Sequence, residues 1–212
     1  MMMRSLFRLM IALSAVFLAI RIGYSQPLIT TTIGDRTSTS KVGYFVLDFD
    51  DSGAKPETYA FAWNYEGTKT GTDFLLALQS ALTGPKGFQQ DGVVFPGLGY
   101  AVQTIGYNGR NQSSDTNPNG YWNLWLGIDG KNWTSSQFGS DSVILSDTPV
   151  FTQNELSGSS WQGWRWVNDF NTDIAQAPRT PFLAAAAPEP GMIGYALLSL
   201  GCGVLTLRKK CR

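Results

Sequence analysis

The stretch "GTDFLLALQSAL", residues 71–82, carries the clearest helical pattern in the body of this 212-residue chain. Its apolar side chains recur three or four positions apart, at Phe74, Leu75, Leu78, Ala81 and Leu82. Thr72 can cap the start, Asp73 suits the positive end of the helix dipole, and a Gly-Pro pair at 84–85 ends the segment. The spacing therefore predicts a helix over residues 72–82 that packs one face on a sheet.

The segments on both sides of this helix have the pattern of strands. Tyr59, Phe61 and Trp63 alternate with other residues between 58 and 65, which indicates a strand with one buried face. Clusters of Gly, Asn, Asp and Ser, which are typical of turns, separate further β-prone runs. These runs cover residues 43–49, 100–107, 121–128, 142–145 and 161–167. The order predicts an α+β fold, with one helix packed on a mostly antiparallel, aromatic-rich sheet.

The amino-terminal segment, residues 1–25, differs from the body of the chain. It has a positively charged start, an apolar run of about 12 residues and small residues before a polar stretch, as secretory signal peptides have. We expect cleavage between Ser25 and Gln26; an uncleaved membrane anchor is the alternative. Residues 26–42, rich in Thr and Ser, are predicted to be a flexible lead-in to an exported domain over residues 43–177.

Charge and residue usage exclude several function classes for the exported part. Residues 26–187 contain nine Lys or Arg against fifteen Asp or Glu, a net charge of −6, although the whole chain is neutral. Such an acidic surface repels phosphate, so we reject a nucleic-acid partner. The chain has no histidine, and its two cysteines, Cys202 and Cys211, lie in the last eleven residues. Ser-His-Asp catalysis, Cys-His catalysis and ordinary zinc sites are therefore excluded from the exported part.

Side chains that carry oxygen atoms form two weaker candidate sites, one for calcium binding and one for glycoside hydrolysis. Asp48, Asp50 and Ser52 hold positions 1, 3 and 5 of a calcium-type loop, but position 12 is Tyr59 instead of Glu, so a turn is favoured. Carboxylates could also form the acid pair of a glycoside hydrolase. The available ones are Glu57, Glu66, Asp129, Asp169 and Asp173, and no spacing singles out two of them. We expect no catalytic residue, no metal and no cofactor.

The carboxyl-terminal end has the composition of a short membrane helix. Residues 178–187 are predicted to be a spacer between the exported domain and the tail. Residues 191–207 contain no charge and would extend about 25 Å as a helix, near the lower limit for crossing a bilayer. A basic cluster follows at once, made of Arg208, Lys209, Lys210 and Arg212. Basic residues after a spanning helix hold that end in the cytoplasm and stop translocation.

Just before this helix stands Pro188-Glu189-Pro190, and the three parts in this order resemble the PEP-CTERM sorting tails of Gram-negative bacteria. The match covers residues 188–212. The resemblance implies an exosortase as partner, a membrane-embedded cysteine peptidase that cuts near the motif. The domain is then released or transferred to the cell surface or to an extracellular polysaccharide matrix. A permanent membrane anchor, whose prolines only mark the start of the helix, is the alternative.

Within the body of the chain, four stretches resemble a small β-grasp-like domain related to the carboxy-terminal domain of transcobalamin. They are the predicted helix, "GYAVQTIGYNG" at 99–109, "GYWNLWLGIDGKNW" at 120–133 and "WQGWRW" at 161–166. The resemblance spans residues 43–168 and implies a β-grasp-like sheet. It also suggests a cobalamin-like small ligand as an alternative function.

Aromatic side chains are the candidate ligand-binding residues of this domain. On a strand, Trp164 and Trp166 share one face, while Tyr121 and Trp125 lie opposite Trp122. Such platforms can stack on sugar rings, and extracellular polysaccharide is the candidate ligand. Rings that simply fill the core are the alternative.

Together these patterns predict an exported, non-catalytic protein of the cell surface or extracellular matrix, anchored in the membrane as a precursor. The domain is either a binding module or a structural component of the matrix.

Overall fold

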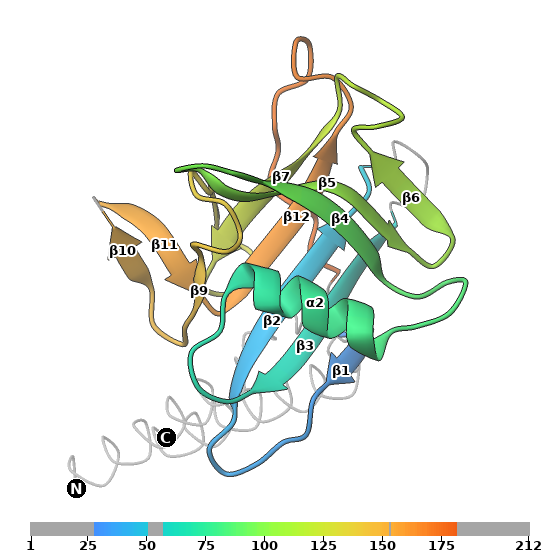
Figure 1. The fold of residues 1–212 in the computed structure, drawn as a ribbon. Coiled ribbons are helices and arrows are strands. Elements are labelled where there is room, and N and C mark those ends of the chain that lie inside the picture. The colour runs from blue at the N-terminus through green and yellow to red at the C-terminus, as the bar shows by residue number, and fades with distance from the viewer. Residues whose placement is uncertain (1–27, 51–56, 153, 182–212) are drawn as a thin grey trace, which may run out of the picture. The chain divides into compact units, whose positions relative to one another are not determined.

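The central element is a six-stranded sheet with the order β1-β3-β2-β12-β7-β8 (Figure 1). Its strands are β1 (Thr31–Ile33), β2 (Lys41–Asp48), β3 (Thr58–Tyr65), β7 (Tyr121–Gly127), β8 (Trp133–Ser135) and β12 (Trp161–Val167). The computed structural model describes residues 28–50, 57–152 and 154–181. The predicted signal peptide and sorting tail lie outside these residues.

The two strands at the middle of the sheet run parallel. β2 forms an antiparallel hairpin with β3, β12 lies parallel to β2, and β7 is antiparallel to β12. Across the described strands, six neighbouring pairs are antiparallel and three are parallel. The described residues therefore form mostly β-sheet with one helix, and the sheet is rich in aromatic side chains, as the sequence predicted.

The helix α2 (Gly71–Ala81) follows the β2–β3 hairpin, and its cap differs from the prediction. Thr70, not Thr72, is the capping residue: its Oγ1 accepts from Asp73 N, and the Asp73 carboxylate accepts from Thr70 N at 2.8 Å. This reciprocal pair is a capping box. The Thr72 hydroxyl instead lies 2.8 Å from that of Ser140. The helix therefore starts one residue earlier than predicted, because the acidic residue stands three positions after Thr70.

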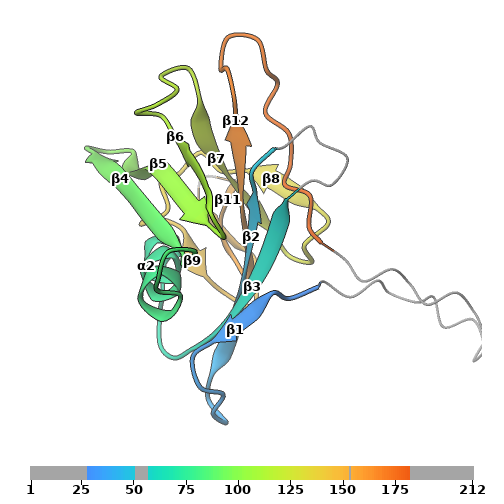
Figure 2. The ribbon, with the colours of Figure 1, turned by 90° about the vertical axis from the view of Figure 1, so that its right-hand side faces the viewer.

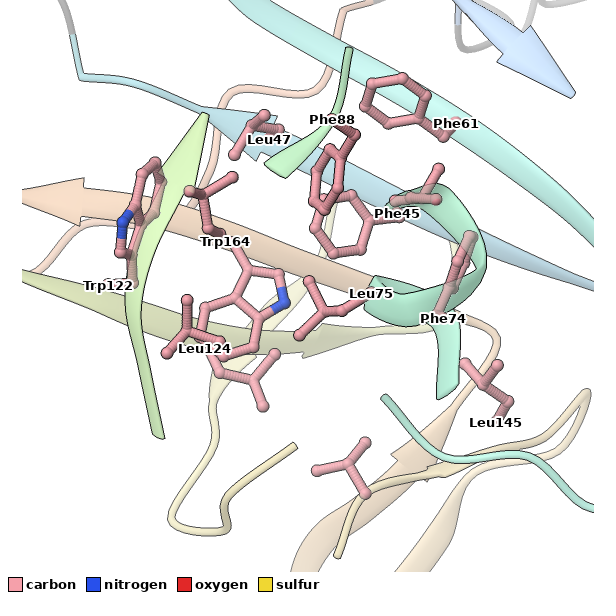
Figure 3. Packing of buried hydrophobic residues seen from close by; sticks show 14 of the residues in the cluster. Phe45, Leu47, Phe61, Phe74, Leu75, Phe88, Trp122, Leu124, Leu145 and Trp164 are labelled. Carbon is pink, nitrogen blue, oxygen red and sulfur yellow. The ribbon is translucent and has the colours of Figure 1, made fainter. Parts of the chain in front are cut away.

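Buried side chains on α2 join it to one face of the central sheet. Phe74, Leu75 and Leu78 are fully buried. Figure 3 shows the Trp164 indole beside Leu75, and Phe45 beside Phe74, whose ring centroid is 5.5 Å away. This face of the sheet is therefore the main hydrophobic core, as the helical spacing predicted.

Two smaller three-stranded sheets complete the domain. The first consists of β4 (Gln89–Phe95), β5 (Gly99–Tyr107) and β6 (Arg110–Ser113), and the second of β9 (Ile144–Leu145), β10 (Val150–Thr152) and β11 (Glu155–Ser159). Figure 2 shows the first of them on the same side of the central sheet as α2. Val102 and Ile105 of β5 are buried in the same core cluster as the helix.

The opposite face of the central sheet is also covered. Val46, Ala60 and Trp161 form a second buried cluster, and the Trp161 indole stacks on Tyr44 with 4.3 Å between ring centroids. Gly163 faces Pro178 here so closely that an added Cβ would lie 2.4 Å from the proline Cγ. Strands covered on both faces carry continuous burial instead of alternation, and all seven residues of β12 are buried.

The described domain extends further in both directions than the predicted range 43–177. β1 lies inside the predicted flexible lead-in, and there the Thr37 hydroxyl donates to the Glu66 carboxylate at 2.7 Å. At the other end, Leu28 N donates to Pro181 O at 2.7 Å, within the predicted spacer. These bonds correct both boundaries: chain entry and chain exit meet at one edge of the fold.

No helix among the described residues is long and apolar enough to cross a membrane. The residues predicted to do so, 191–207, lie outside the described part of the chain.

Candidate functional site

The predicted stacking tryptophans lie in the core. Trp122, Trp164 and Trp166 are 5%, 2% and 0% exposed. Two of their indole N–H groups are used internally: Trp122 Nε1 donates to Gln112 O at 3.1 Å, and Trp166 Nε1 donates to the Asn168 side chain at 2.8 Å. The prediction that these three rings bind a ligand is therefore corrected; they hold the β4–β6 sheet and α2 onto the central sheet.

Tyr121 and Trp125, the other two predicted rings, are half-buried and lie on the opposite face of β7. In register, Tyr121 is paired with Val167 and Trp125 with Gly163 of the covered strand β12. The face assignments from strand alternation are confirmed. Because three of the five rings lie on the face of the sheet that α2 and β4–β6 cover, and these two lie on the opposite face, the five do not form one platform.

The predicted calcium-type loop begins inside an ion-pair cluster. Asp48, at the end of β2, is completely buried, and its carboxylate accepts from the backbone N and the Nε of Arg179, both at 2.9 Å. Arg165 Nε lies 3.8 Å from the same carboxylate, and Arg165 also pairs with Asp50. Two carboxylates thus face two guanidinium groups. The Asp48 oxygens accept hydrogen bonds from arginine. This favours the interpretation of the loop as a turn rather than as a calcium site.

This ion-pair cluster joins segments far apart in sequence. Arg179 and Asp48 are separated by 131 positions, and Arg165 Nη1 donates to Ala177 O at 2.8 Å. The last described residues are therefore fastened to the central sheet by charge-assisted hydrogen bonds, which are stronger than neutral ones.

The carboxylates weighed for glycoside hydrolysis are engaged in local contacts. Glu57 pairs with Arg110 at 3.6 Å, and the hydrogen bonds from Thr37 and Thr39 lower the pKa of Glu66. The other three hold turns. Asp129 accepts from the backbone of residues 131 and 132, Asp169 accepts from Asn171 N, and Asp173 accepts from Asp169 N. Within the described residues, no group of three or more acidic, His or Cys side chains is arranged to hold a metal.

A groove of about 530 Å³ lies between the end of β7, strand β8 and the β10–β11 hairpin. Its apolar lining includes Leu126, Ile128, Trp133, Pro149, Phe151 and Leu156. Its polar lining includes Asn132, Thr134, Ser135, Gln137, Asn154 and Glu155. The lining thus combines apolar side chains with an equal number of polar groups that could orient a ligand.

Sequence reasoning missed this groove. Most of its lining lies in a segment rich in Gly and Ser, from 131 to 160, that carries no strong strand pattern. The available signal is Val150-Phe151-Thr152, a β-prone triplet with an aromatic residue in a region rich in small and polar residues.

Tyr65 is a titratable group without a function in this arrangement, and it gives a pH-dependent prediction. Its hydroxyl is buried and has no hydrogen-bond partner among the described residues. Burial, and then the negative charge of Asp147, raise the pKa of Tyr65 from 10.0 to about 12. Between these pH values the folded state keeps a proton that the unfolded state loses, so the free energy of unfolding falls as pH rises.

We expect the variant Tyr65→Phe to lose this part of the pH dependence. Urea unfolding at several pH values between 9 and 12 measures it, and the difference between variant and parent isolates Tyr65 from the other tyrosines. Parallel pH curves for the two proteins would show that burial does not raise this pKa.

The predicted sorting motif (Pro188, Glu189 and Pro190), the basic cluster of Arg208, Lys209, Lys210 and Arg212, and the cleavage point at Ser25 and Gln26 all lie outside the described residues. In comparisons with known proteins, no family model, curated protein or solved structure matches the chain.

Proposed function

We propose that this chain is an exported, non-catalytic component of the cell surface or extracellular matrix, sorted through its C-terminal tail by an exosortase. The observation that carries the proposal is the order of three parts at residues 188–212: Pro188-Glu189-Pro190, an uncharged run of 17 residues and a basic cluster. A signal peptide places the domain outside, and the tail then retains it in the membrane until the peptidase acts.

The described domain is compatible with this route. It is fastened at Pro181, and the seven residues from there to Pro188 span at most about 25 Å when extended. The motif is thus close to the domain in sequence. The prolines on both sides of Glu189 fix φ and remove two N–H groups, which favours an extended segment that a peptidase cleft can accept.

The strand arrangement supports a β-grasp-like fold for the domain. A hairpin, a helix that follows it and a parallel pair of central strands are the parts of a β-grasp, and here they are β2–β3, α2 and β2–β12. The additional sheets β4–β6 and β9–β11 are insertions into that plan.

Fractionation of the native host tests the proposal. We expect a longer membrane-bound precursor and a shorter species in the surface or matrix fraction. In a strain lacking the exosortase gene, only the longer species should be found, and in the membrane fraction. Normal appearance of the shorter species in that strain would contradict the proposed partner.

A further inference from the structure

Two aromatic residues, Phe151 and Trp133, line the groove between β7, β8 and the β10–β11 hairpin. Phe151 lies on β10 and is 64% exposed. The pairing of β10 with β11 shifts register between Val150 and Phe151, where β11 has one residue more than β10. Such irregularities re-aim side chains, and this one lies opposite a large apolar ring that is left in solvent. Most of the ring is therefore accessible to a ligand.

Trp133, the second aromatic residue of the lining, is held in place. It lies on β8, its ring centroid is 6.4 Å from that of Trp161, and a Cβ added at Gly163 would lie 3.1 Å from its indole. A ring fixed by its neighbours loses little conformational freedom when a ligand binds against it. The groove thus combines one fixed aromatic surface with one exposed aromatic surface.

The polar groups of the groove match a neutral, hydroxyl-rich ligand. Side-chain amides of Asn132 and Gln137 and hydroxyls of Thr134 and Ser135 can both donate and accept hydrogen bonds, as sugar hydroxyls require. Glu155 is the one charged residue of the lining, and none of the described lining residues is basic. A lining with one carboxylate and no basic residue disfavours acidic sugars, so we expect a preference for neutral ones.

The strands beside the groove are poor templates for a peptide. β8 and β10 lie at sheet edges, but each has only three residues, and the pairing of β10 with β11 is irregular. Short and irregular edges disfavour the addition of a further strand. The ligand is therefore recognised through side chains and not through a backbone ladder.

We propose that this groove binds neutral saccharide units of an extracellular polysaccharide, with Phe151 and Trp133 stacking on sugar faces. The negatively charged faces of aromatic rings attract the polarised C–H groups that a sugar ring presents. This inference rests on the proposed export to a polysaccharide-containing surface and names the ligand class and the site. It moves the ligand-binding role from the buried tryptophans to a part of the domain that ligands can reach.

The test uses the full chain, purified in detergent, titrated with three neutral hexasaccharides: cellohexaose, maltohexaose and laminarihexaose. We expect at least one of them to change the tryptophan emission in a saturable way. Phe151→Ser should weaken that binding about tenfold without changing the melting temperature, because the side chain is exposed. The control Leu98→Ser removes a similarly exposed apolar side chain, 68% exposed, from the turn between β4 and β5, and should leave binding within about twofold.

Charge selection is tested with hexagalacturonate, an acidic hexasaccharide. We expect it to bind at least about tenfold more weakly than the neutral ligand, and Glu155→Gln to reduce that difference. Three results would overturn the inference: no saturable binding of any neutral hexasaccharide, unchanged binding by Phe151→Ser, or a preference for the acidic sugar. Displacement of the sugar by an extended peptide at lower concentration would also overturn it, in favour of a polypeptide ligand.

The outcome is separable from that of the proposed function. Phe151→Ser should be processed and sorted like the parent chain, since it lies far in sequence from the sorting motif. Normal sorting without sugar binding would refute the groove alone, whereas sugar binding together with a surface species that still carries residues 208–212 would refute the sorting proposal alone.

Discussion

Asp48→Ala is expected to lower the free energy of unfolding by about 3–5 kcal/mol, because it leaves two arginines without their central carboxylate. Asp48 is completely buried, and the Arg165 side chain is only 9% exposed. Removing one partner of a buried ion pair strands the other charge in a medium that solvates it poorly. Urea unfolding of the parent and the variant, followed by tryptophan emission, measures the difference.

A matched control is available on the surface. The Glu57 and Arg110 side chains, 41% and 37% exposed, form a pair at 3.6 Å, and Glu57→Gln should change the free energy of unfolding by less than about 1 kcal/mol. An equally small effect for Asp48→Ala would mean that the cluster does not hold the last described residues on the sheet. Accelerated proteolysis near residue 179 in the Asp48 variant would be a second sign that it does.

Replacement of Pro188-Glu189-Pro190 by three alanines is expected to abolish processing. The alanines restore two backbone N–H groups, remove the fixed φ angles and delete the carboxylate, so the segment no longer presents the signature that the peptidase reads. The chain should then accumulate in the membrane fraction with its basic cluster intact. Immunoblots of membrane and surface fractions give the ratio of the two species.

Asp115→Ala serves as the control for this variant. Asp115 is exposed in the turn after β6, well away from both chain ends in sequence. We expect its surface yield to equal that of the parent. Equal surface yields of the triple-alanine variant and the parent would refute the role of the motif.

Local patterns predicted the elements that depend on neighbouring residues. The strands at 58–65 and 161–167 have the predicted bounds, and α2 differs by one residue at each end. Apolar spacing along the chain suffices for such elements. The helix cap was predicted at Thr72, but Thr70 is the capping residue. The signal that decides between them is local, because Asp73 stands three positions after Thr70.

The same patterns could not predict whether the aromatic rings are buried or exposed. Alternation places Trp122 on one face of β7, but whether that face is covered depends on the β4–β6 sheet. Its first strand, Gln89–Phe95, contains Asp91 and Gly92, and its pairing with β5 shifts register between these two residues. The ion pair between Asp48 and Arg179 could not be predicted from local patterns either, because the two residues are 131 positions apart. Contacts of this kind come from the folded topology and leave no local signal.

Intact mass measurement of the protein extracted from the surface of its native host tests the central claim, that the tail is a processing signal. We expect a species that begins near Gln26, ends close to Pro190 and contains no cysteine, because Cys202 and Cys211 leave with the tail. A thiol reagent should therefore add no mass to it. A surface species that still carries Arg208 to Arg212 would show that the tail is a permanent anchor and would contradict the account.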